Sequence, residues 1–201
     1  TSGLVSTKDA IIFLLLLLIP SFALVFQLNS LTIWISFVAL LFSLTYPFTK
    51  RFFAIPQLYL GVTFGFGILM AFSAIQNTIP LEAQILFIAN IFWVFAYDSH
   101  YAISDMEDDK KLNIYSAPLT FNNKIILMIV FSYFLMFLSL FIIGFLKEFT
   151  ISFYCLLGLA ILVSMYGCFE SRGMEPYKNF KAFLRNNYIG LIIFAGFFSQ
   201  M

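Results

Sequence analysis

A cluster of acidic residues stands out in a chain that is otherwise strongly apolar. The segment YAISDMEDDKK, residues 101–111, carries four carboxylates, at Asp105, Glu107, Asp108 and Asp109. A further carboxylate, Asp98, lies just upstream inside the apolar run FWVFAYDSHYA. Carboxylates next to hydrocarbon are costly, and ionisable residues within apolar spans generally have a functional role. This segment is therefore a candidate functional site.

The spacing of these residues indicates what the site could bind. On a helix that continues through the segment, Asp98, Tyr101, Asp105 and Asp109 share one face, because they are three, four or seven positions apart. Carboxylates on one face repel one another, and a divalent cation relieves that repulsion. Mg²⁺ is typically held by one or two protein carboxylates, water and the phosphates of a substrate. The pattern predicts half of a metal–diphosphate site.

The remaining polar residues of the segment have simpler expected roles. Glu107 and Asp108 point away from the shared face and are expected to be solvated, as most charge runs are. His100 is the single histidine of the chain. It has no cluster of further ligands, so it is expected to form a hydrogen bond near a helix end rather than to bind metal.

Cationic residues occur at a second position that could meet the acids. The stretch YPFTKRF, residues 46–52, places Tyr46 one helical turn before Lys50, with Arg51 beside it. Such cations could hold a diphosphate or a carboxylate. Equally, Lys and Arg flank the cytoplasmic ends of many membrane spans without a chemical role. The residues alone do not decide between these two interpretations.

Two other stretches favour structural roles. In FLRNNYIG, residues 183–190, the polar residues Arg185, Asn186 and Asn187 are expected to anchor a helix at the membrane interface. In GVTFGFG, residues 61–67, Gly61 and Gly65 are four apart, which is typical of closely packed membrane helices.

Composition identifies the class of protein. The chain has 201 residues, of which 62% are apolar and 10% charged, whereas soluble domains have about 25% charged residues. Several runs reach the roughly 20 residues that a helix needs to cross a bilayer, and the short alternating runs of a barrel are missing. The net charge of +1 gives no footprint for nucleic acid. Cys155 and Cys168 would lie about 20 Å apart on a straight helix, so no disulfide is expected between them.

The elements that must position the acids are membrane helices. The predicted fold is an all-α, polytopic membrane helix bundle with seven spans, at residues 10–28, 31–48, 55–75, 83–103, 125–146, 149–169 and 183–200. With these spans, every Lys and Arg except Lys147 falls on one side of the membrane. Basic residues in short loops mark the cytoplasmic side. The acidic segment lies on this side, so any chemistry is expected at the cytoplasmic face.

The acidic segment also resembles a known motif. YDSHYAISDMEDDKKLNIYS, residues 97–116, is similar to the second aspartate motif of UbiA-type intramembrane prenyltransferases, and most similar to the branch that acts on 4-hydroxybenzoate. Asp105 and Asp109 match the metal-binding aspartates, and Lys111 and Ser116 match the downstream pattern. Asn113 departs from the usual glycine. The stretches at residues 46–74 and 180–196 are similar to later family helices, and TSGLVS is similar to the residues directly after the family's RPL.

The resemblance implies an activity and its substrates. It implies Mg²⁺-dependent transfer of a polyprenyl group from polyprenyl diphosphate to the ring carbon ortho to the hydroxyl of 4-hydroxybenzoate, in ubiquinone biosynthesis. The membrane is expected to be a bacterial inner or mitochondrial inner membrane, with the site on the cytoplasmic or matrix side. The implied site residues are Asp105 and Asp109 for metal and catalysis, Asp98 and Tyr101 for the acceptor, and Tyr46, Lys50, Arg51 and Lys111 for diphosphate or benzoate.

The resemblance also predicts a missing part. The family has nine transmembrane helices and a first aspartate motif, NDxxDxxxD, which does not occur here. Residues 1–201 are therefore expected to form a single transmembrane prenyltransferase domain that has seven of the nine helices. Without the first motif, this stretch alone is expected to be inactive.

Other functions make different predictions. A CDP-alcohol phosphotransferase would carry DG and AR elements around its aspartates, and these are missing. A transporter or channel with an acidic cytoplasmic mouth would carry inverted repeats or charges distributed along its spans. Menaquinone-, haem- and chlorophyll-type prenyltransferases are alternatives within the same family, and YDSHYA favours the hydroxybenzoate branch.

Overall fold

The computed structural model describes residues 5–201, and these residues form helices and no strand. The predicted all-α bundle is confirmed. The elements are α1 (Thr7–Val25), α2 (Ser30–Thr49), α3 (Pro56–Gln76), α4 (Leu81–Ser104), α5 (Met106–Lys111), α6 (Ala117–Phe121), η1 (Asn122–Lys124), α7 (Ile125–Leu146), α8 (Ile151–Ser171) and α9 (Pro176–Phe198). Of the TSGLVS stretch, residues 1–4 lie outside the described part.

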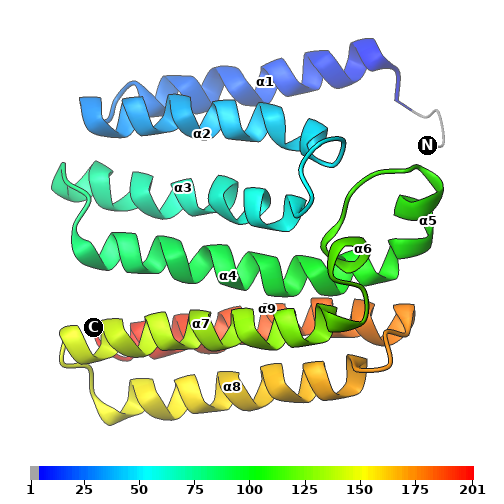
Figure 1. The fold of residues 1–201 in the computed structure, drawn as a ribbon. Coiled ribbons are helices and arrows are strands. Elements are labelled where there is room, and N and C mark those ends of the chain that lie inside the picture. The colour runs from blue at the N-terminus through cyan, green and yellow to red at the C-terminus, as the bar shows by residue number, and fades with distance from the viewer. Residues whose placement is uncertain (1–4) are drawn as a thin grey trace.

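Consecutive long helices run antiparallel, and α4 lies at the centre of the bundle (Figure 1). It packs against α3 on one side and against α7 and α9 on the other, while α8 covers α7 and α9 (Figure 1). At the edge, α1 contacts α2 and buries none of its residues. Because α4 carries Asp98 and Tyr101, the central helix of the bundle is also the one that leads into the acidic segment.

Six helical segments of residues 5–201 are long and apolar enough to cross a bilayer. They correspond to the first six predicted spans, with α6, η1 and α7 forming one continuous candidate, Ala117–Leu146. The seventh predicted span corresponds to α9, which does not meet the same criterion. Its first turns carry Lys178, Lys181 and Arg185, so its crossing of the membrane remains a prediction, supported by its packing against α4 and α8.

The helix α9 begins seven residues before the predicted start at residue 183. Pro176 occupies its first position, where the fixed φ of proline suits a helix and its missing N–H is not needed. The predicted span left residues 176–182 in the link that precedes it. The additional two turns bring Asn179 and Ala182 into the buried interior.

The basic residues gather at one end of the bundle, as predicted. The chain turns at this end after α2, α4 and α8, which are followed by the segments that hold Lys50, Lys110 and Arg172 (Figure 1). Lys147 lies at the opposite end, where its ammonium group pairs with Glu82 at 2.6 Å. The arrangement confirms the charge asymmetry.

Two smaller predictions are confirmed. A Cβ atom on Gly61 would lie 2.8 Å from the carbonyl oxygen of Ile91, and one on Gly65 would lie 2.6 Å from the ring of Phe87. Both glycines therefore allow α3 and α4 to approach closely. Cys155 and Cys168 are free thiols.

Candidate active site

The acidic segment is built around a break between two helices. The helix α4 ends at Ser104, and Asp105 follows with φ −95° and ψ 0° before α5 begins at Met106. The carbonyl oxygen of Asp105 accepts the N–H groups of Asp108 and Asp109, both at 3.0 Å. The continued helix on which the shared face was based is therefore interrupted at Asp105. Acids in the first turn of α5 favour a new helix start, because the N-terminal end of a helix attracts negative charge.

Asp109 is buried and forms an ion pair across the bundle. Only 6% of its side chain is exposed, and the Lys50 ammonium group lies 3.0 and 3.3 Å from its two carboxylate oxygens. Lys50 directly follows the end of α2, and 31% of its side chain is exposed. A charge as buried as that of Asp109 requires a partner of this kind. The structure thus joins one predicted metal ligand to one predicted diphosphate ligand.

The backbone after α5 holds this pair in place. The N–H of Tyr115 donates to the carbonyl oxygen of Lys50 at 2.7 Å. Two residues later, the N–H of Ala117 donates to the side-chain oxygen of the buried Gln57 at 3.0 Å. The loop after the acids therefore returns to the junction of α2 and α3 and fixes the position of Lys50.

Two further predicted residues lie near this pair. Asp98 is within electrostatic range of Lys50, Asp105 and Asp109. Tyr46 is similarly close to Asp98 and Asp109.

Tyr101 is close to the same acids from the exposed side of α4. It is within electrostatic range of Asp105, Asp98 and Asp109, and it is 39% exposed. Its ring centroid lies 5.2 Å from that of Phe183 on α9. The fold thus gathers six of the predicted site residues at one end of the bundle: Tyr46, Lys50, Asp98, Tyr101, Asp105 and Asp109.

Two predicted residues have other partners. The Arg51 guanidinium lies over the ring of Phe48, at 5.9 Å from its centroid, and the residue is exposed. The exposed Lys111 pairs with Asp108 at 3.0 Å, and this carboxylate raises the pKa of its ammonium group. Substrate contacts by Arg51 and Lys111 remain predictions that require these side chains to reorient.

The acids suit a metal ion that also binds substrate. Within residues 5–201, no group of three or more His, Cys, Asp and Glu side chains could hold a metal ion. Mg²⁺ needs fewer ligands when phosphates and water complete its shell, and two carboxylates one turn apart fit that requirement. Asp105 is half-buried, and its side chain has no ion pair within the same residues. Asp105 and Asp109 would hold the ion together with the diphosphate.

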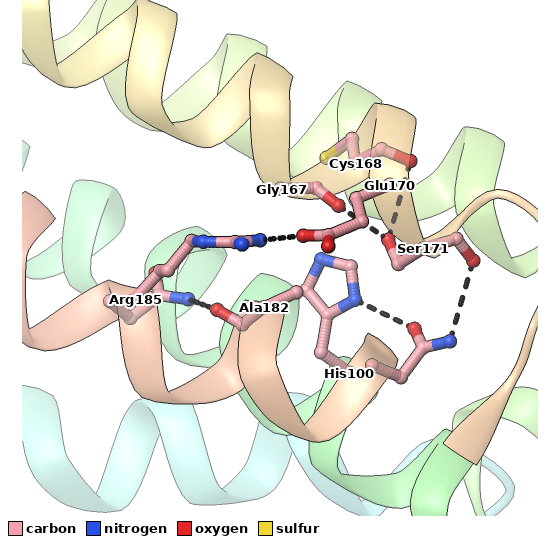
Figure 2. Close-up of polar contacts among 9 residues, drawn as sticks. His100, Gly167, Cys168, Glu170, Ser171, Ala182 and Arg185 are labelled. Atoms are coloured by element: carbon pink, nitrogen blue, oxygen red, sulfur yellow. Dashed lines mark hydrogen bonds and ion pairs between the residues drawn. The ribbon is translucent and has the colours of Figure 1, made fainter. Parts of the chain in front are cut away.

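A polar network on the far side of α4 was only partly predicted. Nδ1 of His100 lies 2.9 Å from Oδ1 of Asn179, whose Nδ2 donates to the carbonyl oxygen of Ser171. Figure 2 shows this network and, beside it, the ion pair between the Arg185 guanidinium and Glu170. The hydrogen-bonding role predicted for His100 is confirmed. Because the network joins α4, α8 and α9, its role is structural.

The prediction for Asn186 is wrong. Its side chain is buried between helices, and its Oδ1 accepts hydrogen bonds from Trp93 Nε1 and from the Tyr133 hydroxyl, both at 2.9 Å. The predicted span began at residue 183, which put Asn186 at a helix end. Because α9 begins at Pro176, Asn186 lies further inside the helix and the bundle. Arg185 pairs with Glu170, and its guanidinium lies 4.7 Å from the centroid of the Tyr166 ring.

The model of the UbiA prenyltransferase family matches residues 1–188. The chain belongs to this family. The structure of a UbiA homolog from Aeropyrum pernix K1 superimposes with a TM-score of 0.83 over 98% of this chain and 74% of that one, at 22% identity. That match confirms the UbiA fold and carries no further information about activity.

Curated UbiA relatives share more sequence. The 4-hydroxybenzoate octaprenyltransferase of Methylobacillus flagellatus is 42% identical over 97% of this chain and 66% of its own length. The enzymes of the same name from Francisella tularensis subsp. mediasiatica and Nitrosomonas europaea are 47% and 42% identical, over 96% and 97% of this chain. The chain spans about two thirds of the length of these relatives.

Proposed function

We propose that this protein transfers a polyprenyl group from polyprenyl diphosphate to the ring carbon ortho to the hydroxyl of 4-hydroxybenzoate, with Mg²⁺, in ubiquinone biosynthesis. The observation that carries the proposal is the similarity, over nearly the whole chain, to enzymes named 4-hydroxybenzoate octaprenyltransferase. The cluster around the Asp109–Lys50 pair supports it, because it combines carboxylates for a metal with a cation for a diphosphate.

In this proposal the charged residues bind the diphosphate. Asp105 and Asp109 hold Mg²⁺, which, when bound, offsets the charge that develops on the departing diphosphate. Lys50 lies between solvent and Asp109, so its ammonium group can contact a diphosphate oxygen without leaving the carboxylate. Arg51 directly follows Lys50, and Lys111 is two residues after Asp109. Rotation of either side chain would add a contact to the diphosphate. Tyr46 lies one helical turn before Lys50, where its hydroxyl would add a contact to the same group.

The carbon–oxygen bond of the allylic diphosphate breaks in this reaction, and its electron pair leaves with the diphosphate. The ring carbon ortho to the phenol hydroxyl then forms a bond to the allylic carbon, and loss of the ring proton restores aromaticity. Asp98 and Tyr101 lie on α4 beside the acids, where they would orient the acceptor ring. The apolar helices would accommodate the polyprenyl chain.

The proposal also states the membrane in which the protein lies and the domain to which residues 1–201 belong. Residues 1–201 belong to a single transmembrane prenyltransferase domain in a bacterial inner or mitochondrial inner membrane. The gathering of basic residues at the acidic end supports an orientation with the site on the cytoplasmic or matrix side.

The test is an assay of the full-length gene product in detergent with 4-hydroxybenzoate and polyprenyl diphosphates of several lengths. We expect prenylated 4-hydroxybenzoate by mass spectrometry, loss of product with EDTA and recovery with added Mg²⁺. Transfer to a naphthoate, haem or chlorophyll precursor, with none to 4-hydroxybenzoate, would overturn the assignment of the acceptor. Equal turnover with and without EDTA would show that the reaction does not require Mg²⁺.

A further inference from the structure

A row of cations held over aromatic rings lies along the seam between α8 and α9, near the basic end of the bundle. The Arg185 guanidinium pairs with Glu170 of α8 (Figure 2), and it lies 4.7 Å from the centroid of the Tyr166 ring. Four residues earlier on α9, the Lys181 ammonium group lies 4.5 Å from the centroid of the Tyr177 ring. The Glu170 carboxylate is within electrostatic range of both cations, which places this stripe of α9 beside α8.

Positive charge exceeds negative charge in this part of the chain. Residues 170–185 contain two acids and four cations: Glu170, Glu175, Arg172, Lys178, Lys181 and Arg185. Each acid has a partner, since Glu170 pairs with Arg185 and Glu175 pairs with Lys178. Within residues 5–201, Arg172 and Lys181 pair with no carboxylate. These two cations are therefore available to an anion from outside the chain.

An exposed apolar strip of α8 leads to the first of these cations. Arg172 directly follows α8, and its guanidinium lies 4.3 Å from the centroid of the Phe169 ring. Leu162 and Met165, seven and four positions before Phe169, share its face of the helix, and all three side chains are 62–64% exposed. The helix α8 lies at the edge of the bundle, so this strip faces the surrounding lipid (Figure 1).

The aromatic rings of the seam mark the level of the lipid headgroups. Tyr166 and Tyr177 are 57% and 68% exposed, and tyrosines beside Lys and Arg at the ends of membrane helices are typical of the membrane–water interface. A ring occupies one side of the cation above it and leaves further N–H groups free to donate to an oxyanion. Phosphate oxygens are suitable acceptors, because charge-assisted hydrogen bonds to phosphate are strong.

We propose that the seam between α8 and α9 binds the headgroup of an anionic phospholipid, with Arg172 and Lys181 donating to the oxygens of the headgroup and the acyl chains along the exposed strip of α8. Basic pockets between membrane helices on the cytoplasmic side are suited to such headgroups. The bilayer supplies this ligand at a high local concentration, whereas a free phosphate would leave the apolar strip uncovered. The inference is separate from the proposed function, because lipid binding is measured without turnover.

Native mass spectrometry of the full-length gene product in detergent measures this binding. Titration with dioleoyl phosphatidylglycerol should give a saturable adduct. Dioleoyl phosphatidylcholine, which has the same acyl chains and no net charge, should bind about tenfold more weakly or less. Inorganic phosphate at an equal concentration should not displace phosphatidylglycerol. Equal binding of the two lipids would overturn the inference, and displacement by phosphate would show that the seam takes a free anion instead.

The double variant Arg172→Gln/Lys181→Gln tests the two cations. It should weaken binding of phosphatidylglycerol about thirtyfold, because each basic residue near an anionic lipid contributes about fivefold in affinity. Lys8→Gln/Lys124→Gln is the matched control, since it removes the same charge from two exposed lysines at the same end of the bundle, outside the seam (Figure 1). This control should bind phosphatidylglycerol as the wild type does.

The charge-conserving variant Arg172→Lys/Lys181→Arg should also retain binding, which separates loss of the cations from loss of the fold. The inference is wrong if the Arg172→Gln/Lys181→Gln variant binds phosphatidylglycerol normally, because the lipid is then held elsewhere. An equal loss in the Lys8→Gln/Lys124→Gln control, or loss of binding in the charge-conserving variant, would contradict it as well.

Discussion

At the scale of single residues, the Asp109–Lys50 pair serves both stability and the proposed chemistry. The carboxylate is almost fully buried, whereas the ammonium group is nearly one-third exposed. Removing either partner leaves a charge without its counterion, while removing both avoids that cost. This asymmetry allows the structural role of the pair to be separated from its chemical role.

We expect Asp109→Asn and Lys50→Met each to lower the free energy of unfolding by about 1–3 kcal/mol, less than for a fully buried pair because solvent screens Lys50. The double variant Lys50→Met/Asp109→Leu should recover most of this loss and remain inactive. Thermal unfolding in detergent and the transfer assay measure the two effects. A double variant that is less stable than both single variants would show that the pair is not coupled as described.

Asp105 should behave differently, because it has no ion pair within the described residues. We expect Asp105→Asn to lower turnover about a hundredfold or more through loss of a metal ligand, since each 1.36 kcal/mol of lost transition-state stabilisation is about tenfold in rate. Its unfolding temperature should match that of the wild type. Asp108→Asn, at an exposed acid three residues away, is the control and should retain near-normal turnover. Normal turnover in Asp105→Asn would exclude the residue as a metal ligand.

At the scale of elements, the contact between α3 and α4 sets the position of the site. The helix α3 comes directly after the segment that holds Lys50, and α4 leads into the acids. The separation of α3 and α4 therefore controls the distance between Lys50 and Asp109. Gly61 permits this approach because its backbone lies against that of Ile91.

Gly61→Ala should therefore destabilise the protein by about 1–3 kcal/mol, because a backbone carbonyl cannot move aside as a side chain can. It should also lower turnover, since moving α3 away from α4 separates Lys50 from Asp109. Gly67→Ala, nearly two turns along α3 at a glycine with open space around it, should be neutral or slightly stabilising. Equal unfolding temperatures for the two variants would contradict the close contact.

At the scale of the whole molecule, the charge distribution predicts orientation in the membrane. All described turns at the acidic end carry basic residues, whereas the opposite end carries Lys147, paired with Glu82. Basic loops remain on the cytoplasmic side during insertion.

Single cysteines test this orientation in a background in which Cys155 and Cys168 are replaced by alanine. In sealed inside-out vesicles, a membrane-impermeant maleimide should label cysteine at Glu107 or Arg172 and should not label cysteine at Glu148. Right-side-out vesicles should give the opposite pattern. Labelling of all three positions from the same side would contradict the bundle topology.

Much of the fold can be predicted from local pattern. The apolar runs predicted the first six spans to within a few residues, because a bilayer requires about 20 apolar residues per helix and the links between them are short. The number of predicted spans determined on which side of the membrane each basic residue was placed. The short helices α5 and α6 were not predicted as separate elements, because segments of six and five residues are too short to show an amphipathic pattern.

The sequence by itself determined the membrane bundle, the charged end and the identity of the acidic residues, because each depends on composition or on spacing along one helix. Only the tertiary structure decided that Lys50 pairs with Asp109, 59 positions away, and that Asn186 is a buried acceptor for Trp93 and Tyr133. The return of the loop after α5 to Lys50, through the N–H of Tyr115, belongs to the same group. These features depend on which helices pack together, and the distance between two helices is not contained in the spacing of residues along either one.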